Sequence, residues 1–155
     1  MVEKLVSSLV LETIAHATED LGKVKIALLN LLPPDLRKYY HGKVKIQELI
    51  GFHGNPISLL KLYITKQEHA QLTLINMLSG MEDFDLNELI NTLSLRLDSS
   101  SNLYIRFDKQ AAYLGKLRIM QGDDVIKVRV SFLPHIRGLE KVKYAILSLR
   151  SCGHG

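Results

Sequence analysis

The most regularly patterned part of the chain is residues 102–133, with the sequence NLYIRFDKQAAYLGKLRIMQGDDVIKVRVSFL. Apolar and polar side chains alternate in three of its segments, at residues 103–107, 116–119 and 126–130. Because successive side chains of a β-strand point to opposite faces, each segment predicts a half-buried strand, apolar on one face and basic on the other. The second connection contains Gly122 and Asp123, which are typical of a tight turn. The pattern therefore predicts an antiparallel meander.

The polar face of this predicted meander carries five cations and one aromatic residue: Arg106, Lys116, Arg118, Lys127, Arg129 and Tyr104. Like charges on neighbouring strands repel one another, so the pattern is typical of a surface that binds an anion. Nucleic-acid phosphates are such an anion, and an unpaired base could stack on Tyr104. Exposed strands also carry Lys and Arg merely to prevent edge pairing, and composition alone does not separate the two interpretations.

Between the first two predicted strands, the sequence DKQAAYLG fits a single helical turn. Asp108 is expected to cap it, because an Asp side chain accepts hydrogen bonds from the free amides of a first turn. Ala111, Ala112 and Leu114 are expected to pack inward. Lys109 and Gln110 would then remain free to contact a ligand beside the basic strands.

The remaining segments are expected to cover or extend this sheet. A strand is predicted at residues 2–14, followed by a helix that Thr18 caps and that Pro33 and Pro34 end. Further helices are predicted at residues 66–79, 86–97 and 136–149. Asp85 is expected to cap the second of these.

Residues 43–65 are open to two interpretations. Residues 43–50 have the composition of a strand, and the next segment is either a helix that begins after Asn55 and Pro56 or a returning strand at residues 57–65. The sequence TKQE from Thr65 has the spacing of a capping box, which begins a new helix. A continuous helix would not need this signal, so we favour the hairpin.

Together these elements predict an α+β fold: a two-layer sandwich whose mostly antiparallel sheet of about six strands carries three or four helices on one face. Residues 1–150 are expected to form a single domain, followed by a flexible tail at residues 151–155. Cys152 is the only cysteine, which suits a reducing cytosol. No run approaches the roughly 20 apolar residues of a membrane span, and the N-terminus is unlike a signal peptide. We therefore expect a cytoplasmic protein.

The net charge of +4 is unevenly distributed along the chain. Residues 1–95 contain 9 Lys and Arg against 11 Asp and Glu, whereas residues 96–155 contain 11 against 5. The C-terminal part therefore has a net charge of +6 and the rest a charge of −2. This asymmetry indicates an anionic partner on one surface.

No part of the sequence assembles an active site. Neither a phosphate-binding loop nor a dinucleotide fingerprint occurs, and the six histidines lack metal-ligand spacing. The glycine-rich segment at residues 51–55 is typical of a turn, at whose tip His53 is a candidate for phosphate contact. Asp123 and Asp124 could hold Mg²⁺, but solvated turn carboxylates are far commoner. We therefore expect no metal, no cofactor and no catalysis.

Four segments carry a family resemblance. The sequence YIRFDKQAAYLG at residues 104–115 is the most specific, and it is followed by DVIKVRV at residues 124–130. AHATED at residues 15–20 and HGNPI at residues 53–57 precede them. In this order they resemble a family of small archaeal RNA-binding proteins described as exosome-associated or exosome-subunit-like. The resemblance spans most of the chain.

This resemblance implies an α+β domain with a β-hairpin before a helix, because the family is similar in fold to the ribosomal protein that binds 5S RNA. It carries no established catalytic residues. One departure is that Phe52 occupies the place of the first of two histidines in the family's glycine loop. A role that needs a histidine pair, such as metal binding, is not expected here.

The leading hypothesis is a non-catalytic RNA-binding protein that acts as an accessory to exosome-type RNA processing or degradation. Its partners would be RNA and proteins of that machinery, with no membrane. The alternative is a protein-interaction module in which the basic face binds an acidic protein. The predicted RNA contacts are Arg106, Lys109, Lys116, Arg118, Lys127, Arg129, Tyr104 and His53.

Overall fold

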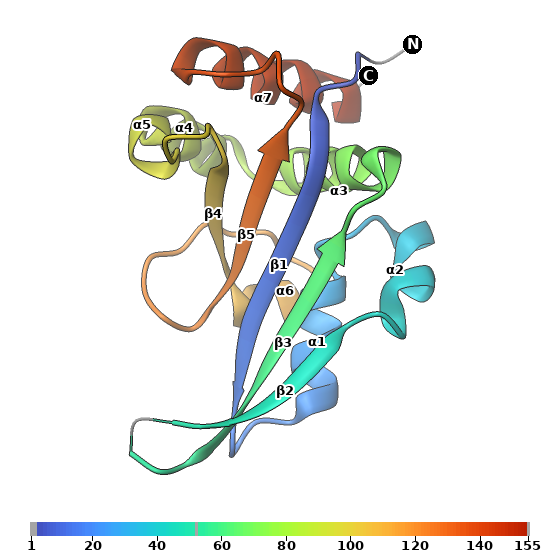
Figure 1. The fold of residues 1–155 in the computed structure, drawn as a ribbon, viewed down its shortest axis with the longest axis vertical. Coiled ribbons are helices and arrows are strands. Elements are labelled where there is room, and N and C mark those ends of the chain that lie inside the picture. The colour runs from blue at the N-terminus through green and yellow to red at the C-terminus, as the bar shows by residue number, and fades with distance from the viewer. Residues whose placement is uncertain (1–2, 52, 155) are drawn as a thin grey trace.

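The computed structural model describes residues 3–51 and 53–154, and these form five strands and seven helices. The elements are β1 (Val6–His16), α1 (Leu21–Leu29), α2 (Pro34–His41), β2 (Lys45–Ile50), β3 (Pro56–Ile64), α3 (Gln67–Gly80), α4 (Asp83–Asn91), α5 (Leu93–Arg96), β4 (Leu103–Asp108), α6 (Lys109–Tyr113), β5 (Val125–Phe132) and α7 (Leu139–His154). The strands form one sheet in the order β2-β3-β1-β5-β4, and every neighbouring pair is antiparallel (Figure 1). The predicted α+β architecture is confirmed.

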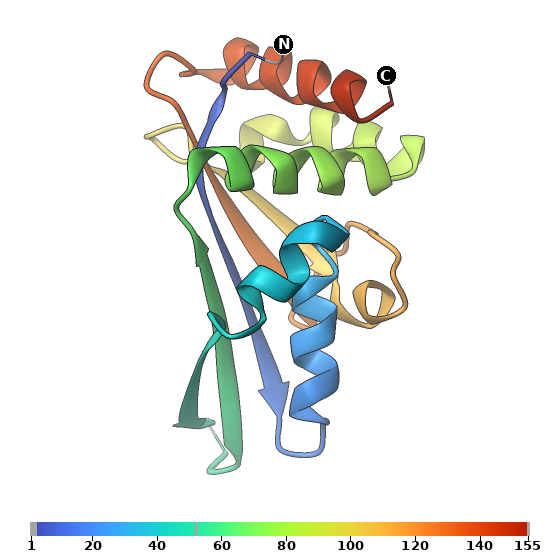
Figure 2. The same ribbon diagram turned by 90° about the vertical axis from the view of Figure 1, so that its right-hand side faces the viewer.

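The helices lie on one side of the sheet, and the other side is open (Figure 2). Strand alternation explains this arrangement, because one face of each long strand is apolar. Leu11 of β1, Leu62 of β3, Ile105 of β4 and Val128 of β5 are buried between the sheet and the helices. The side chains between them in sequence point to the open face. Among the described helices, none is long and apolar enough to cross a membrane.

The hairpin of β2 and β3 is confirmed, with Lys45 opposite Lys61 and Ile50 opposite Pro56. The signal that favoured it is nevertheless not the one that forms. Lys66 is the N-cap of α3, and no side chain caps that helix end, so the capping box at Thr65 is absent. What decides the hairpin is the alternation of β3 itself, which buries Leu60, Leu62 and Ile64.

The predicted strand at residues 116–119 is wrong. This segment only runs along the outer edge of β4, where the Asp108 amide donates to the Arg118 carbonyl at 2.8 Å and the Met120 amide donates to the Arg106 carbonyl at 3.1 Å. β4 therefore pairs directly with β5, which is inserted between β1 and β4. The segment is too short and is followed at once by the turn at Gly122, whose φ is 118°. The sheet accordingly has five strands where about six were expected.

Two helix caps differ from the prediction. Asp20, not Thr18, caps α1, and its carboxylate accepts from the amides of Gly22 at 2.8 Å and Lys23 at 3.3 Å. Asp85 does not cap α4 but is buried in its first turn, where it accepts from the Ile119 amide. In both cases several acidic or hydroxyl residues are adjacent in sequence, so local propensity does not select among them.

The ends of two other helices also differ. Pro33 and Pro34 do not simply end a helix, because Pro34 is the first residue of α2, where a missing amide is tolerated. At the C-terminus α7 continues to His154, so residues 151–154 are helical and not an irregular tail. Gly153 lies so close to α3 that a Cβ at this position would be 2.5 Å from the Cβ of Ser79. The predicted first strand begins at residue 2, and the predicted tail ends at residue 155. Residues 1–2 and residue 155 lie outside the described residues.

Asp108 caps α6 as predicted, and its carboxylate accepts from the amides of Gln110 at 3.0 Å and Ala111 at 3.5 Å. Replacing Asp108 by Ala should lower the free energy of unfolding by about 1 kcal/mol, the usual loss for an N-cap. Urea denaturation would measure it. Asp123→Ala, in the exposed turn nearby, is the control that should change stability by less than about 0.5 kcal/mol. Equal midpoints for Asp108→Ala and the parent protein would contradict the capping role.

Candidate nucleic-acid interface

The open face of the sheet presents a line of charged side chains that crosses all five strands. The antiparallel register places one residue of each strand side by side, in the order Lys45, Lys61, Glu12, Lys127 and Arg106. We call these five residues the basic row. With neighbouring strands about 4.8 Å apart, the row is about 19 Å long. It contains four cations and a single carboxylate.

A second line, the tyrosine row, lies beside the basic row on the same face. It consists of Tyr63, Val10, Arg129 and Tyr104, which are again paired across β3, β1, β5 and β4. Tyr63 and Tyr104 are 42% and 43% exposed, so their rings are accessible from solvent. Three strand spacings separate them, about 14 Å. The face therefore presents two aromatic rings with cations between and beside them.

The cations at the two ends of the basic row have different surroundings. At the β2 end, the Lys61 ammonium is 3.5 Å from Glu12, and the ammonium groups of Lys45 and Lys61 lie over the Tyr63 ring at 5.1 Å and 5.4 Å. The Tyr63 hydroxyl, followed by Glu12, raises the pKa of Lys61, which therefore stays charged. At the other end, within the described residues, no carboxylate lies within 4.0 Å of Arg106 or Lys127. Neither of these two cations is paired with a carboxylate of the described part of the chain.

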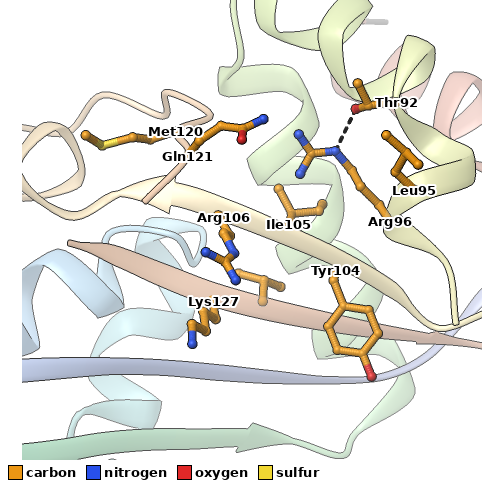
Figure 3. A pocket seen from close by; sticks show the side chains of 10 residues that line it. Thr92, Leu95, Arg96, Tyr104, Ile105, Arg106, Met120, Gln121 and Lys127 are labelled. Atoms are coloured by element: carbon orange, nitrogen blue, oxygen red, sulfur yellow. Dashed lines mark hydrogen bonds between the residues drawn. The ribbon is translucent and has the colours of Figure 1, made fainter. Parts of the chain in front are cut away.

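A pocket of about 430 Å³ opens at the β4 end of the basic row (Figure 3). Arg106 and Lys127 rise from its floor, and Arg96 reaches in from the last turn of α5. The Arg96 Nε donates to the Thr92 hydroxyl at 2.8 Å, and one Arg106 terminal nitrogen donates to the Gly122 carbonyl at 2.9 Å. Burial, with a smaller contribution from the charge of Arg106, lowers the pKa of Arg96, although Glu88 opposes this.

Tyr104 is held in place at the edge of this pocket. Its hydroxyl donates to the Asp98 carboxylate at 3.0 Å, and Asp98 also accepts from the amides of Asn102 and Ser100. The Asn102 amide is the largest influence on Asp98, and these hydrogen bonds lower the pKa of its carboxyl. Asp98 therefore remains ionised at neutral pH and fixes the ring orientation, which leaves a face of Tyr104 available for stacking.

The model of a protein family described as RNA-binding matches residues 8–132. The chain belongs to this RNA-binding family. It is 34% identical over 120 residues to a Pyrococcus abyssi protein named as an RNA-binding protein, covering 77% of each chain. It is 32% identical over 130 residues to an uncharacterized protein of Methanocaldococcus jannaschii, covering 83% of this chain and 85% of the relative. A crystal structure from Archaeoglobus fulgidus is similar in fold, with a TM-score of 0.76, 28% identity and coverage of 93% of this chain and 99% of the other.

Four of the predicted contacts of this family member lie together on the open face: Tyr104, Arg106, Lys127 and Arg129. Two others do not share it. Lys116 is exposed in the segment beside β4, and Arg118 is bound through its Nε to the buried Asp85 of α4 at 3.1 Å. Their alternation in sequence was interpreted as a strand of the sheet, and that strand does not form.

Lys109 is not free, contrary to the prediction. It is 3% exposed, and its ammonium donates to the Ile14 carbonyl, the Glu19 carboxylate and the Asp124 carboxylate, each at 2.8 Å. Leu114, expected inside, is exposed instead. With His16, the same two carboxylates place possible metal-ligand atoms within 4.8 Å of one another, but the Lys109 ammonium already contacts both carboxylates. Lys109 thus joins the end of β1 to α6 and to the turn before β5.

His53 is exposed in the loop between β2 and β3, at the far end of that hairpin (Figure 1). The five-residue distance from Pro56 to Lys61 along β3 corresponds to about 17 Å, so His53 is well separated from the basic row. Phe52, which replaces the first loop histidine of the family, lies outside the described residues. The loop and the basic row are therefore two separate places on the surface.

The sequence analysis missed Lys45, Lys61, Tyr63 and Arg96. For β3 the signal was present, because Lys61 and Tyr63 alternate with the buried Leu60, Leu62 and Ile64. Placing them beside Lys127 and Arg106 additionally requires the pairing of β1 with both β3 and β5. For Arg96 no local signal existed, because its position depends on how α5 packs against β4.

Proposed function

We propose that this chain binds single-stranded RNA on the open face of its sheet, without catalysing a reaction on it. The observation that carries the proposal is the juxtaposition of the basic row and the tyrosine row on a face that none of the described helices covers. Family membership and the printed name of the Pyrococcus abyssi relative support RNA as the ligand.

Phosphates and bases would use different parts of this face. Lys45, Lys61, Lys127, Arg106 and Arg129 provide the positive charge that follows a phosphate backbone, and binding would release counterions. Tyr63 and Tyr104 provide rings for bases. In a duplex the bases are already stacked on one another, so only a single strand can place them on these rings. The arrangement therefore favours single-stranded over double-stranded RNA.

We also propose that the chain accompanies exosome-type RNA processing or degradation in the cytoplasm. The family resemblance supports the association with RNA processing or degradation. The single, exposed Cys152 suits a reducing compartment, which supports the cytoplasmic location. Affinity purification of the tagged chain from an archaeal host would test it. Exosome subunits should co-purify with the parent protein and survive nuclease treatment if the contact is direct. Their absence in both conditions would contradict the association.

Replacing Tyr63 or Tyr104 by Ala should weaken binding to a single-stranded RNA of about ten nucleotides by roughly 1–3 kcal/mol each, the usual value of one stacked base. Binding to a duplex of the same sequence should hardly change. Fluorescence anisotropy on both RNAs would measure this, with Tyr144→Ala, an exposed tyrosine on α7, as the control.

Tyr104→Phe separates stacking from the hydrogen bond to Asp98, because it keeps the ring and removes the hydroxyl. It should retain most of the affinity for the single strand. Equal losses on single-stranded and duplex RNA in the alanine variants would contradict stacking. No measurable affinity of the parent protein for any RNA would contradict the proposed function and would favour an acidic protein as the partner of this face.

A further inference from the structure

We propose that the pocket at the β4 end of the basic row binds the phosphorylated terminal nucleotide of an RNA strand. This inference rests on the proposed function, because it assigns the pocket to one end of the strand that crosses the open face. The observation behind it is that Arg96, Arg106 and Lys127 line the same pocket, together with uncharged side chains.

The first argument is position. The basic row runs across the sheet and ends at Arg106, and β4 is the last strand on that side. Beyond β4, the α5 end and Met120 and Gln121 of the segment beside it form the walls of the pocket. A strand bound along the row therefore reaches the pocket where the sheet stops. Its volume of about 430 Å³ is within the usual range for one small-molecule ligand, so it admits one nucleotide.

The second argument is charge. Three cations from three different elements, α5, β4 and β5, face the same hollow, and within the described part of the chain no carboxylate lies within 4.0 Å of any of them. An internal phosphodiester has one negative charge, whereas a terminal phosphate monoester has about −1.5 to −2 at pH 7. The terminal group matches three cations better than an internal one does.

The third argument is hydrogen-bond geometry. A guanidinium has five N–H donors in a planar fork, which suits bidentate contact with phosphate oxygens. Arg96 uses its Nε on Thr92, and Arg106 uses one terminal nitrogen on Gly122. These bonds orient both forks and leave their remaining donors for a ligand. The site is therefore organised before any anion enters.

The fourth argument is the nature of the remaining walls. Leu95 is 85% exposed and Met120 is 40% exposed, although both are apolar, and they flank the pocket together with the ring of Tyr104. A base placed among them would cover this apolar surface. The Gln121 amide also lines the pocket and can both donate to and accept from a base edge. An anion with an attached flat aromatic ring that has a polar edge matches these walls.

The test compares three internally labelled RNAs of one sequence, about ten nucleotides long, with a 5′-phosphate, a 3′-phosphate or hydroxyl groups at both ends. One phosphorylated form should bind about tenfold more tightly than the hydroxyl form, since hydrogen bonds to charged groups are among the stronger ones. Which of the two does so identifies the end. The preference should shrink as the pH falls below about 6, where the terminal phosphate loses its second charge.

Arg96→Ala should remove the preference, and Arg96→Lys, which keeps the charge without the fork, should reduce it. Arg129→Ala is the matched control, because Arg129 lies on the same face but does not line the pocket. It should weaken all three RNAs equally and keep the preference. Circular dichroism and thermal midpoints would confirm that the variants fold. Equal affinity of the parent protein for the three RNAs overturns this inference alone, whereas no binding to any RNA overturns the proposed function as well.

Discussion

The triple substitution of Arg106, Lys127 and Arg129 by Ala is expected to weaken single-stranded RNA binding about a hundredfold at 0.1 M salt. Each phosphate contact contributes about −0.7 to the slope of log K against log salt concentration on a single strand. Losing three contacts flattens that slope by about two units. At 1 M salt the counterion contribution vanishes, so the parent protein and the variant should have similar affinity there. Because 0.1 M is a tenfold lower salt concentration, a slope difference of about two units corresponds to about a hundredfold difference in affinity.

The matched control replaces Arg137, Lys141 and Lys143 by Ala. These three cations are exposed near or on α7, so the net charge changes equally while the open face is untouched. The control should retain most of the affinity and most of the slope. Both variants should unfold within about 1 kcal/mol of the parent protein, because exposed substitutions have small effects. Equal losses of affinity in the two variants would mean that RNA responds only to net charge, and would contradict a specific face.

The faces of β4 and β5 could be predicted because their alternation is regular. Leu103, Ile105 and Phe107 are buried, and the residues between them point outward, as their period of two requires. This local rule correctly placed Tyr104, Arg106, Lys127 and Arg129 on one face. At residues 116–119 the rule again gives the right faces, with Leu117 buried and Lys116 and Arg118 exposed, but the segment is not a strand of the sheet. Pairing depends on which strand lies beside a segment and not on its own pattern.

The rest of the site depends on long-range pairing. Lys45 and Lys61 belong to the basic row because β1 lies between β3 and β5 and pairs with both strands. No short segment of the sequence contains this strand order. Arg96 joins the pocket through the packing of α5 on β4. Lys109 is the opposite case: a lysine in a polar turn is normally exposed, and only contact with Glu19, 90 residues earlier in the chain, explains its burial.

Lys109→Met is expected to lower the free energy of unfolding by about 3 kcal/mol at pH 7. Methionine keeps a long apolar side chain but loses the ammonium, so the Ile14 carbonyl and two carboxylates each lose a donor at 2.8 Å. Removing one partner of a buried ion pair costs about 3–5 kcal/mol, and the lower end applies because the Glu19 and Asp124 side chains are 22% and 45% exposed. Lys116→Met, an exposed lysine nearby, should change stability by less than about 0.5 kcal/mol in the same urea titration.

The pH dependence of this loss tests its electrostatic origin. Burial alone would raise the pKa of Glu19, but hydrogen bonds from the His16 amide and Lys109 lower it by more. Burial would also raise the pKa of Asp124, but hydrogen bonds from Lys109 and Gln110 lower it by more. Both pKa values are therefore lowered. Carboxylates with lowered folded-state pKa values stabilise the fold above their unfolded values, near 4, and lose this contribution as the pH falls through the folded ones. The gap between Lys109→Met and the parent protein should therefore narrow as the pH decreases from 7 to about 3. A gap that stays constant would assign the loss to packing and to the Ile14 hydrogen bond, and not to the two carboxylates. Because Lys109 is enclosed by these partners, the folded variant should still bind RNA within about twofold of the parent protein, and a large loss of affinity with intact folding would return Lys109 to the RNA contacts.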